Sequence, residues 1–242
     1  MPEKVIIAMS GGVDSSVAAY LCCKAGYDCI GVTMKLFTND ALSLPREHSC
    51  CSLDDVEDAR SVAEQLGMPY HVFNFADRFE SCVINRFVHA YENGETPNPC
   101  IDCNRYLKFE KLYQRAQELG CTHVVTGHYA RIERAENGRY LLKKGLDPTK
   151  DQSYVLYCLT QQQLAHTLLP LGGMEKTAVR ALADENGFCN GQKPDSQDIC
   201  FVQNGDYADF IEGYTKKHYP PGPFVRCDGT VVGEHRGIIR YT

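Results

Sequence analysis

The stretch VIIAMSGGVDSSVAAYLCCKAG, residues 5–26, decides the fold of this chain. It opens with an apolar run at 5–9 that predicts a buried strand, and its later apolar spacing predicts a helix over 16–25. The turn between them holds two adjacent glycines, which let the backbone approach a bulky anion closely. A helix that starts directly after such a turn presents N–H groups that favour negative charge. We therefore expect an anion site at residues 10–16.

Asp14 is the unusual member of this turn, because a carboxylate beside a phosphate is expected where Mg²⁺ bridges the two. The turn is not a Walker A loop, since no Gly-Lys-Ser/Thr follows the glycines, and it is not GxGxxG. It resembles the PP-loop of the ATP pyrophosphatases. That resemblance implies a site for the β,γ-diphosphate of ATP and cleavage between the α and β phosphates.

The first half of the chain alternates strand and helix patterns. Strands are predicted at 5–9, 29–34, 70–75 and 123–126, and helices at 16–25, from a Ser52 cap to Leu66, at 78–93 and at 107–119. Such alternation indicates right-handed βαβ units and a parallel sheet. Ligands of these sheets bind at the carboxyl ends of the strands, where the glycine turn, Met34 and Gly127-His128 all fall.

The remaining segments are less regular. Residues 94–103 are predicted to be irregular loop because they are rich in Pro, Asn and Cys, and a hairpin is predicted around Asn137-Gly138. Helices are expected at 153–159, 161–168 and 176–186. A polar loop is expected at 194–200, and short strands follow a Pro/Gly hinge at 220–223.

Composition limits the possible classes of protein. The chain has 242 residues, 43% of them apolar, and a net charge of −6. No apolar run is long enough for a membrane span, and no secretion signal opens the chain, so we expect a soluble cytoplasmic protein without a membrane partner. An acidic chain needs a local basic patch to bind RNA; Arg105, Lys108, Lys111 and Arg115 could form one, or simply a solvated helix face.

Thirteen cysteines are present, and without a secretion signal we do not expect them to form disulfides. Several lie in apolar runs and are expected to pack as small core residues. Core packing does not explain the cysteines that lie in polar stretches, which are Cys50, Cys51, Cys100, Cys103 and Cys200.

Four segments together resemble the tRNA-specific 2-thiouridylases, the MnmA family. They are AMSGGVDSS at 8–16, TPNPCIDCN at 96–104, TGHYAR at 126–131 with KDQSYVL at 150–156, and DSQDICF at 195–201. The resemblance implies an α/β fold, with a Rossmann-like parallel sheet of the adenine-nucleotide alpha-hydrolase (PP-loop) type over 1–205. It also implies that 206–242 begins a small central domain, and that the family's C-terminal β-barrel is absent from a truncated chain.

The family replaces the C2 oxygen of the tRNA wobble uridine by sulfur, after ATP has adenylated that oxygen. By resemblance, Cys200 carries the sulfur as a persulfide, received from a sulfur-carrier protein or cysteine desulfurase relay, and Cys103 is the second catalytic cysteine. The ATP-binding residues implied are Ala8, Met9, Ser10, Gly11, Gly12, Val13, Asp14, Ser15, Met34 and Gly127, with Mg²⁺ as cofactor. The tRNA-binding residues implied are His128, Lys150, Asp151 and Gln152.

Several alternatives remain open at this point. Cys100 stands where the family often has an acidic residue, so Cys100, Cys103 and Cys200 could instead ligate a [4Fe–4S] cluster that binds sulfide. A zinc site with Cys50 or Cys51 as fourth ligand is a further possibility. Met34 could be core filler and His128 an ordinary strand-end residue. The whole chain could also be a different PP-loop synthetase, or a metal-stapled RNA-binding module without catalytic activity.

Overall fold

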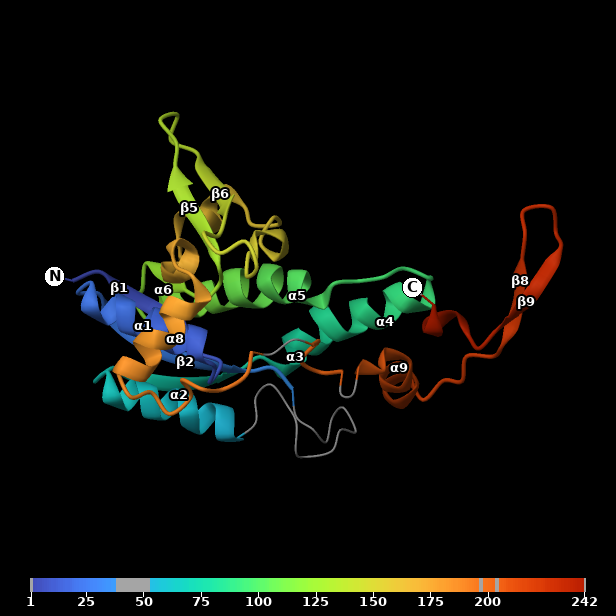
Figure 1. Cartoon of the computed structure of the whole chain (residues 1–242), viewed down its shortest axis with the longest axis horizontal. Helices are drawn as coiled ribbons and strands as arrows, with labels where there is room; N and C mark the ends of the chain where they lie inside the picture. The colour runs from blue at the N-terminus through green and yellow to red at the C-terminus, as the bar shows by residue number, and fades with distance from the viewer. Residues whose placement is uncertain (1, 38–52, 196–197, 203–204, 242) are drawn as a thin grey trace.

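A parallel sheet of five strands forms the centre of the computed structural model, which describes residues 2–37, 53–195, 198–202 and 205–241 (Figure 1). The strands are β1 (Lys4–Ala8), β2 (Asp28–Lys35), β3 (Tyr70–Asn74), β4 (His123–Val125) and β7 (Thr167–Leu168), in the order β3-β2-β1-β4-β7. Every neighbouring pair is parallel. The predicted α/β class is therefore confirmed.

Side chains alternate across the sheet and contribute to two separate cores. Val5 and Ile7 of β1 face α1 (Val13–Lys24), α2 (Leu53–Gln65) and α8 (Lys176–Glu185). Ile6 between them faces the opposite layer, where it packs with Phe79, Leu107 and many other apolar residues. We call this second group the cysteine-side core, because it includes Cys103 and has Cys200 packed against it.

Two long helical segments build the cysteine-side layer, and each contains π-helical turns. The first consists of α3 (Ala76–Phe79), η1 (Glu80–Ile84) and α4 (Asn85–Glu92), and the second of α5 (Pro99–Asp102), η2 (Cys103–Lys111) and α6 (Leu112–Glu118). The prediction of an irregular loop over 94–103 is therefore wrong for residues 99–103, because the helix begins at Pro99. Asn98 caps it by accepting the Cys100 N–H at 3.1 Å, and proline fits the first helical position.

The middle of the chain matches the sequence prediction in part. The hairpin of β5 (Ala130–Arg134) and β6 (Tyr140–Lys144) confirms the turn at Asn137-Gly138, and α8 confirms the helix expected from 176.

Two predicted helices in this region are shorter than expected. The helix expected over 153–159 is only a 3-10 turn, η3 (Ser153–Val155). The helix expected over 161–168 ends at Ala165 as α7 (Gln161–Ala165), because Thr167 and Leu168 pair with β4. A two-residue strand has no periodicity by which the sequence could reveal it. A 3-10 turn, η4 (Pro170–Gly173), follows it.

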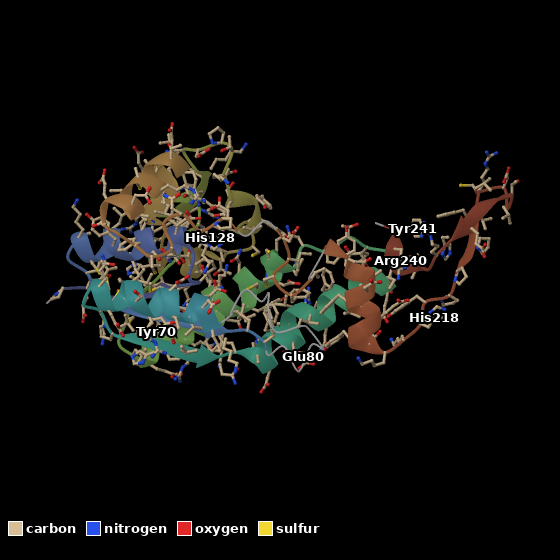
Figure 2. All side chains as sticks on the ribbon, turned by 60° about the horizontal axis from the view of Figure 1, so that its bottom comes forward. Tyr70, Glu80, His128, His218, Arg240 and Tyr241 are labelled. Atoms are coloured by element: carbon tan, nitrogen blue, oxygen red, sulfur yellow. The ribbon has the colours of Figure 1, made fainter. Side chains whose placement is uncertain are left out.

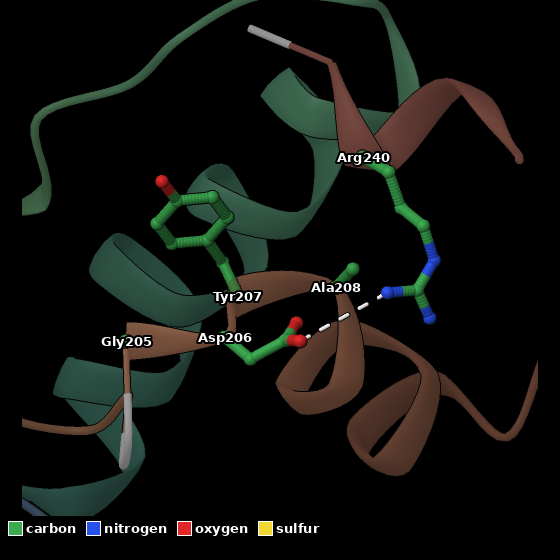
Figure 3. Close-up of a pocket in the computed structure, with 5 residues that line it drawn as sticks. All are labelled: Gly205, Asp206, Tyr207, Ala208 and Arg240. Atoms are coloured by element: carbon green, nitrogen blue, oxygen red, sulfur yellow. Dashed lines mark ion pairs between the residues drawn. The ribbon is translucent and has the colours of Figure 1, made fainter. Parts of the chain in front are cut away.

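The last segment contains α9 (Tyr207–Thr215), the hairpin β8 (Gly222–Val225) with β9 (Val231–His235), and η6 (Ile238–Arg240). The hairpin confirms the strands expected there, and it extends away from the rest of the molecule in Figure 1. Buried Phe210 and Ile239 pack into the cysteine-side core. Arg240 ties η6 to α9 through Asp206, Asp209 and Glu212, and Figure 3 shows the first of these pairs. None of the described helices combines the length and the apolar character that crossing a bilayer requires.

Candidate nucleotide site and cysteine region

The glycine turn at residues 10–12 joins the carboxyl end of β1 to helix α1. The helix begins at Val13, three residues before the predicted start, so Asp14, Ser15 and Ser16 lie in its first turn. Gly12 adopts the extended N-cap conformation, and its carbonyl accepts the Ser15 hydroxyl at 2.9 Å. Among the described residues no side chain caps this end of the helix. Its N–H groups and dipole are therefore suited to an anionic ligand.

The carbonyl of Gly11 is held by two residues far along the chain. Asn190, which is 2% exposed, donates its amide to this carbonyl at 3.0 Å and to the Ser16 hydroxyl at 2.9 Å. Lys193 reaches the same carbonyl at 3.5 Å and pairs with Asp55 at 2.6 Å. Gly11 itself has a φ of 76°, and an added Cβ would lie 2.4 Å from the Asp55 carbonyl oxygen. The sequence had assigned no role to Asn190 or Lys193.

Gly127 follows β4 and packs directly on the start of α1. An added Cβ would lie 2.8 Å from the Asp14 carbonyl carbon and 2.9 Å from the Ser15 nitrogen. Backbone atoms cannot yield as a flexible side chain can, so this contact by itself requires glycine. The contact fixes the position of the helix that carries the glycine turn, and the predicted contact of Gly127 with ATP stays a prediction.

Asp14 lies at the centre of a charged network. Its Oδ1 accepts hydrogen bonds from the Tyr129 hydroxyl at 2.7 Å and from the Lys176 ammonium at 2.7 Å, and Oδ2 accepts from Lys176 at 2.8 Å. Lys176 is 8% exposed and opens helix α8. Burial raises the pKa of Tyr129, and so does the hydrogen bond to Asp14. Tyr129 therefore stays protonated and acts as a donor at neutral pH.

Asp195 is the second acid of this network and gathers three cations. Its Oδ1 pairs with Lys176 at 2.8 Å and with Arg180 at 2.9 Å, and its Oδ2 pairs with Lys150 at 2.9 Å. Burial acts to raise its pKa, but the hydrogen bonds from Lys176 and Lys150 outweigh burial and lower it to about 2. Lys176 thus bridges the glycine turn to the segment that leads to Cys200.

Sequence reasoning missed Lys176 and Arg180, although a signal was present. The two cations stand four residues apart at the start of a predicted helix, so they share one face of it. The sequence contained no indication that this face would meet Asp14 and Asp195, because those partners are brought there by the tertiary fold.

Three of the residues expected to bind tRNA make bonds within the chain. Lys150 pairs with Asp195, as described above. Asp151 accepts the Gly145 N–H at 2.9 Å and the Ser153 hydroxyl at 2.9 Å. The Gln152 N–H donates to the Tyr129 carbonyl at 2.9 Å, and the Tyr129 N–H donates to the Gln152 side-chain Oε1 at 3.0 Å. These contacts hold the 150–153 turn against the base of the β5-β6 hairpin, because Tyr129 directly precedes β5 and Gly145 directly follows β6.

His128, the fourth of those residues, lies in the interior (Figure 2). Its Nδ1 is 2.7 Å from the Thr126 hydroxyl, and its ring packs 6.1 Å from that of Phe109. Burial, with a smaller contribution from the charge of Lys108, holds its pKa well below the usual value. In this arrangement His128 is a neutral interior residue and does not present its ring to a large ligand.

The remaining residues expected to bind ATP surround the glycine turn. The side chains of Met9 and Val13 are buried in the core beneath it, so only their backbones are available to a ligand. Met34, 9% exposed at the carboxyl end of β2, and Ala8 belong to the cysteine-side core. Ser10 is exposed, and its N–H lies 3.2 Å from the Ser15 hydroxyl.

Both expected catalytic cysteines lie at the cysteine-side core. Cys103 is the first residue of η2 and is 9% exposed, and its neighbour Asp102 is paired with Arg86 of α4 at 3.0 Å. Cys200 is half-buried, and the next residue, Phe201, packs edge-on against Phe87 of α4 at 5.2 Å. The same helix therefore anchors the residues next to both cysteines.

The three-cysteine metal site weighed from the sequence does not form in this arrangement. Within the described ranges, no three His, Cys, Asp or Glu side chains come together in a way that could hold a metal ion. The burial pattern agrees, since Cys100 is exposed where Cys103 is buried. We derive no step through an iron–sulfur cluster. Cys50 and Cys51, considered as zinc ligands, lie outside the described residues.

The fold and the turn define the class of this protein as an α/β domain of the PP-loop type. A family model described as "tRNA methyl transferase HUP domain" matches residues 3–204. The solved structure of a 4-thiouridine synthetase–RNA complex with bound ATP aligns with a TM-score of 0.54 and 19% identity, over 88% of this chain and 51% of that one. At this identity the likeness shows a shared fold.

Curated relatives then specify the family. The tRNA-specific 2-thiouridylase MnmA of Clostridioides difficile is 53% identical over 100% of this chain and 67% of its own length. The protein of the same name from Clostridium acetobutylicum is 51% identical over 100% of this chain and 68% of its own length. The chain belongs to the tRNA-specific 2-thiouridylase MnmA family, and it spans about two thirds of the length of these relatives.

Proposed function

We propose that this protein is an ATP-dependent sulfurtransferase that converts the C2 carbonyl of the tRNA wobble uridine to a thiocarbonyl. The observation that carries the proposal is that α4 contacts the residues next to both cysteines, Asp102 beside Cys103 and Phe201 beside Cys200. Met34, at the carboxyl end of β2, belongs to the same core. Membership in a family named for this reaction supports it. We further propose that residues 1–205 form the catalytic domain and 206–242 begin a second one.

ATP fits the glycine turn for electrostatic reasons. The uncapped start of α1 offers backbone N–H donors, and Lys176, Lys150 and Arg180 add positive charge nearby. We propose that the β,γ-diphosphate binds here with the adenine near Met34. Of the described residues, Asp14 is the carboxylate that opens this helix, and an oxygen ligand of this kind suits Mg²⁺ together with phosphate oxygens. When bound, the ion would neutralise the charge of the pyrophosphate that leaves.

The sulfur step needs a persulfide that reaches the uridine C2 and a second thiol that reaches the inner sulfur of that persulfide. The uridine O2 attacks the α-phosphorus of ATP and releases pyrophosphate, so that AMP becomes the leaving group at C2. The outer sulfur of a Cys200 persulfide attacks C2 and displaces AMP. The Cys103 thiolate then attacks the inner sulfur of that persulfide, which breaks the S–S bond, leaves 2-thiouridine and forms a Cys103–Cys200 disulfide. An external thiol returns both cysteines to the reduced state.

The partners of this reaction are tRNA and a protein that delivers persulfide sulfur, such as a sulfur carrier or a cysteine desulfurase. We propose that the reaction takes place in the cytoplasm, where the tRNA pool resides. Surface residues of η2 and α6, including Arg105, Lys108 and Lys111, are half-exposed beside the cysteine region. We propose that they attract the tRNA backbone locally, since the protein as a whole is acidic.

The direct test combines the protein, ATP, Mg²⁺, a persulfide donor and unmodified tRNA, and measures 2-thiouridine in digested RNA. We expect product with the wild type and none with Cys103→Ser or Cys200→Ser, although both variants should still bind ATP. Cys227→Ser, which changes an exposed cysteine near the hairpin tip, is the matched control and should remain active. Full activity in either of the first two variants would remove that cysteine from the mechanism.

Measurements of pyrophosphate release and of bound zinc address the two rival functions. Pyrophosphate release that needs a small acid or nucleotide instead of tRNA, and that does not depend on cysteine, would identify a different PP-loop synthetase. Stoichiometric zinc without ATP turnover would identify a structural RNA-binding module.

A further inference from the structure

Asp195 occupies a position where an anionic ligand would be expected. Three cations, Lys150, Lys176 and Arg180, converge on its two oxygens at 2.8–2.9 Å. The side chain of Lys176 is only 9% exposed, and the same ammonium also contacts Asp14 beside the glycine turn. A cation group of this density, next to an uncapped helix start, is the kind of site that binds polyphosphate.

We propose that Asp195 is a built-in anion that competes with the bound polyphosphate for Lys176 and its neighbouring cations, and so links nucleotide occupancy to the segment carrying Cys200. Without nucleotide, Asp195 and Asp14 share Lys176. When a polyphosphate binds at the start of α1, its oxygens attract the Lys176 ammonium, and Asp195 loses one of its three partners. The inference rests on the proposed function, because it assumes that the polyphosphate belongs to ATP.

The segment that contains Asp195 has further anchors on the side away from Cys200, where Lys193 pairs with Asp55 and Asp58 at 2.6 and 2.7 Å. Arg180 donates to the Gly191 and Lys193 carbonyls at 3.0 and 3.2 Å in addition to Asp195. Gln192 donates to both oxygens of Asp184 at 2.8 and 2.9 Å. Asp195 stands five residues before Cys200, so losing its contact with Lys176 removes one of the three ion pairs that hold the chain at this point, while Lys150 and Arg180 remain. Asp195 is thus a positioning residue for the sulfur step.

The test uses Asp195→Asn, which keeps the shape of the side chain and removes its charge. We expect this variant to bind Mg²⁺-pyrophosphate and Mg²⁺-ATP about fivefold more tightly than the wild type, because the cations no longer have an internal competitor. We also expect slower formation of 2-thiouridine, because the Cys200 segment is less well held. Loss of a merely structural residue would weaken pyrophosphate binding as well as slow turnover, whereas we expect tighter binding together with slower turnover.

Asp184→Asn is the matched control. It removes a carboxylate that anchors the same segment through Gln192 but pairs with none of the three cations named above. If loosening of the segment were the cause of tighter binding, this variant would reproduce it, whereas we expect unchanged pyrophosphate affinity. Lys176→Met should weaken pyrophosphate binding.

Binding is measured by calorimetry, and folding of each variant is checked by the rise in melting temperature that pyrophosphate produces. A larger pyrophosphate-induced rise in melting temperature for Asp195→Asn than for the wild type supports the proposal. Each variant is compared with itself without ligand, so a lower starting stability does not affect the comparison. A folded Asp195→Asn protein that binds pyrophosphate no more tightly than the wild type overturns it. A wild-type protein that binds no Mg²⁺-pyrophosphate would instead refute the proposed function.

Discussion

The ammonium of Lys176 lies 2.7 and 2.8 Å from the two carboxylate oxygens of Asp14, although 162 residues separate them along the chain. This contact joins the first turn of α1 to the first turn of α8, and thereby links the glycine turn to a helix that the sequence motifs do not include. Lys176 also reaches Asp195, so a single buried cation connects the start of α1 beside the glycine turn with the chain leading to Cys200.

Gly127→Ala should weaken binding at the proposed nucleotide site by displacing the start of α1, and not by a contact with the ligand itself. The new methyl group would meet the backbone of Asp14 and Ser15 at 2.8–2.9 Å and push the start of α1 away. We expect a loss of stability of ~2 kcal/mol and at least tenfold weaker ATP binding. Urea unfolding and calorimetry measure both. Gly173→Ala is the control, because nothing lies within 4 Å of its added Cβ; equal behaviour of the two variants would contradict the prediction.

Cys100→Ser should separate the two sulfur routes. Cys100 is exposed and precedes the buried Cys103 by one helical turn. In the persulfide route only Cys103 and Cys200 exchange sulfur, so we expect Cys100→Ser to keep activity within about twofold. Cys103→Ser should lose about a thousandfold or more, as expected for removal of a nucleophile. Loss of activity in Cys100→Ser, together with iron in the anaerobically purified wild type, would favour the cluster route instead.

His128 should remain neutral across the physiological range. Because burial holds its folded pKa below that of the unfolded chain, the stability it contributes is complete above about pH 6.5 and declines as the pH falls below that value. NMR should show no titration of its ring around pH 6.5 in the native protein. Unfolding in urea should restore ordinary titration. A native midpoint near 6.5 would mean that His128 is accessible to solvent.

Asp195 should contribute to resistance against acid. Its folded pKa, about 2, lies below the usual 3.8, so its contribution is present above about pH 4 and is lost as the pH falls toward 2. A depression of this size corresponds to ~2 kcal/mol. Asp195→Asn should therefore show a shallower loss of stability between about pH 4 and 2 than the wild type, measured by denaturant unfolding. Glu136→Gln, which removes one exposed carboxylate, serves as the control, and an equal change in the two variants would contradict the prediction.

The amino-acid sequence determined the class of the fold, the glycine turn and the two cysteine segments, because these depend on local patterns. Apolar periodicity, paired glycines and the Asn-Gly turn act over a few residues, and strands β1, β2, β3 and β4 lie where those patterns predict them. The helix start at Asn98-Pro99 had a local signal too, but the prediction gave more weight to the surrounding Pro and Cys residues than to that cap.

Only the tertiary structure decided the partners of the charged residues and the surroundings of His128. Asp14, Lys150, Lys176, Arg180 and Asp195 are spread along the chain. Their ion pairs exist because the fold packs α8 against α1 and brings Lys150 and Asp195 to the start of α8. His128 follows a strand like a ligand-binding residue but is buried against Phe109. Contacts between distant segments depend on packing, which no local pattern records.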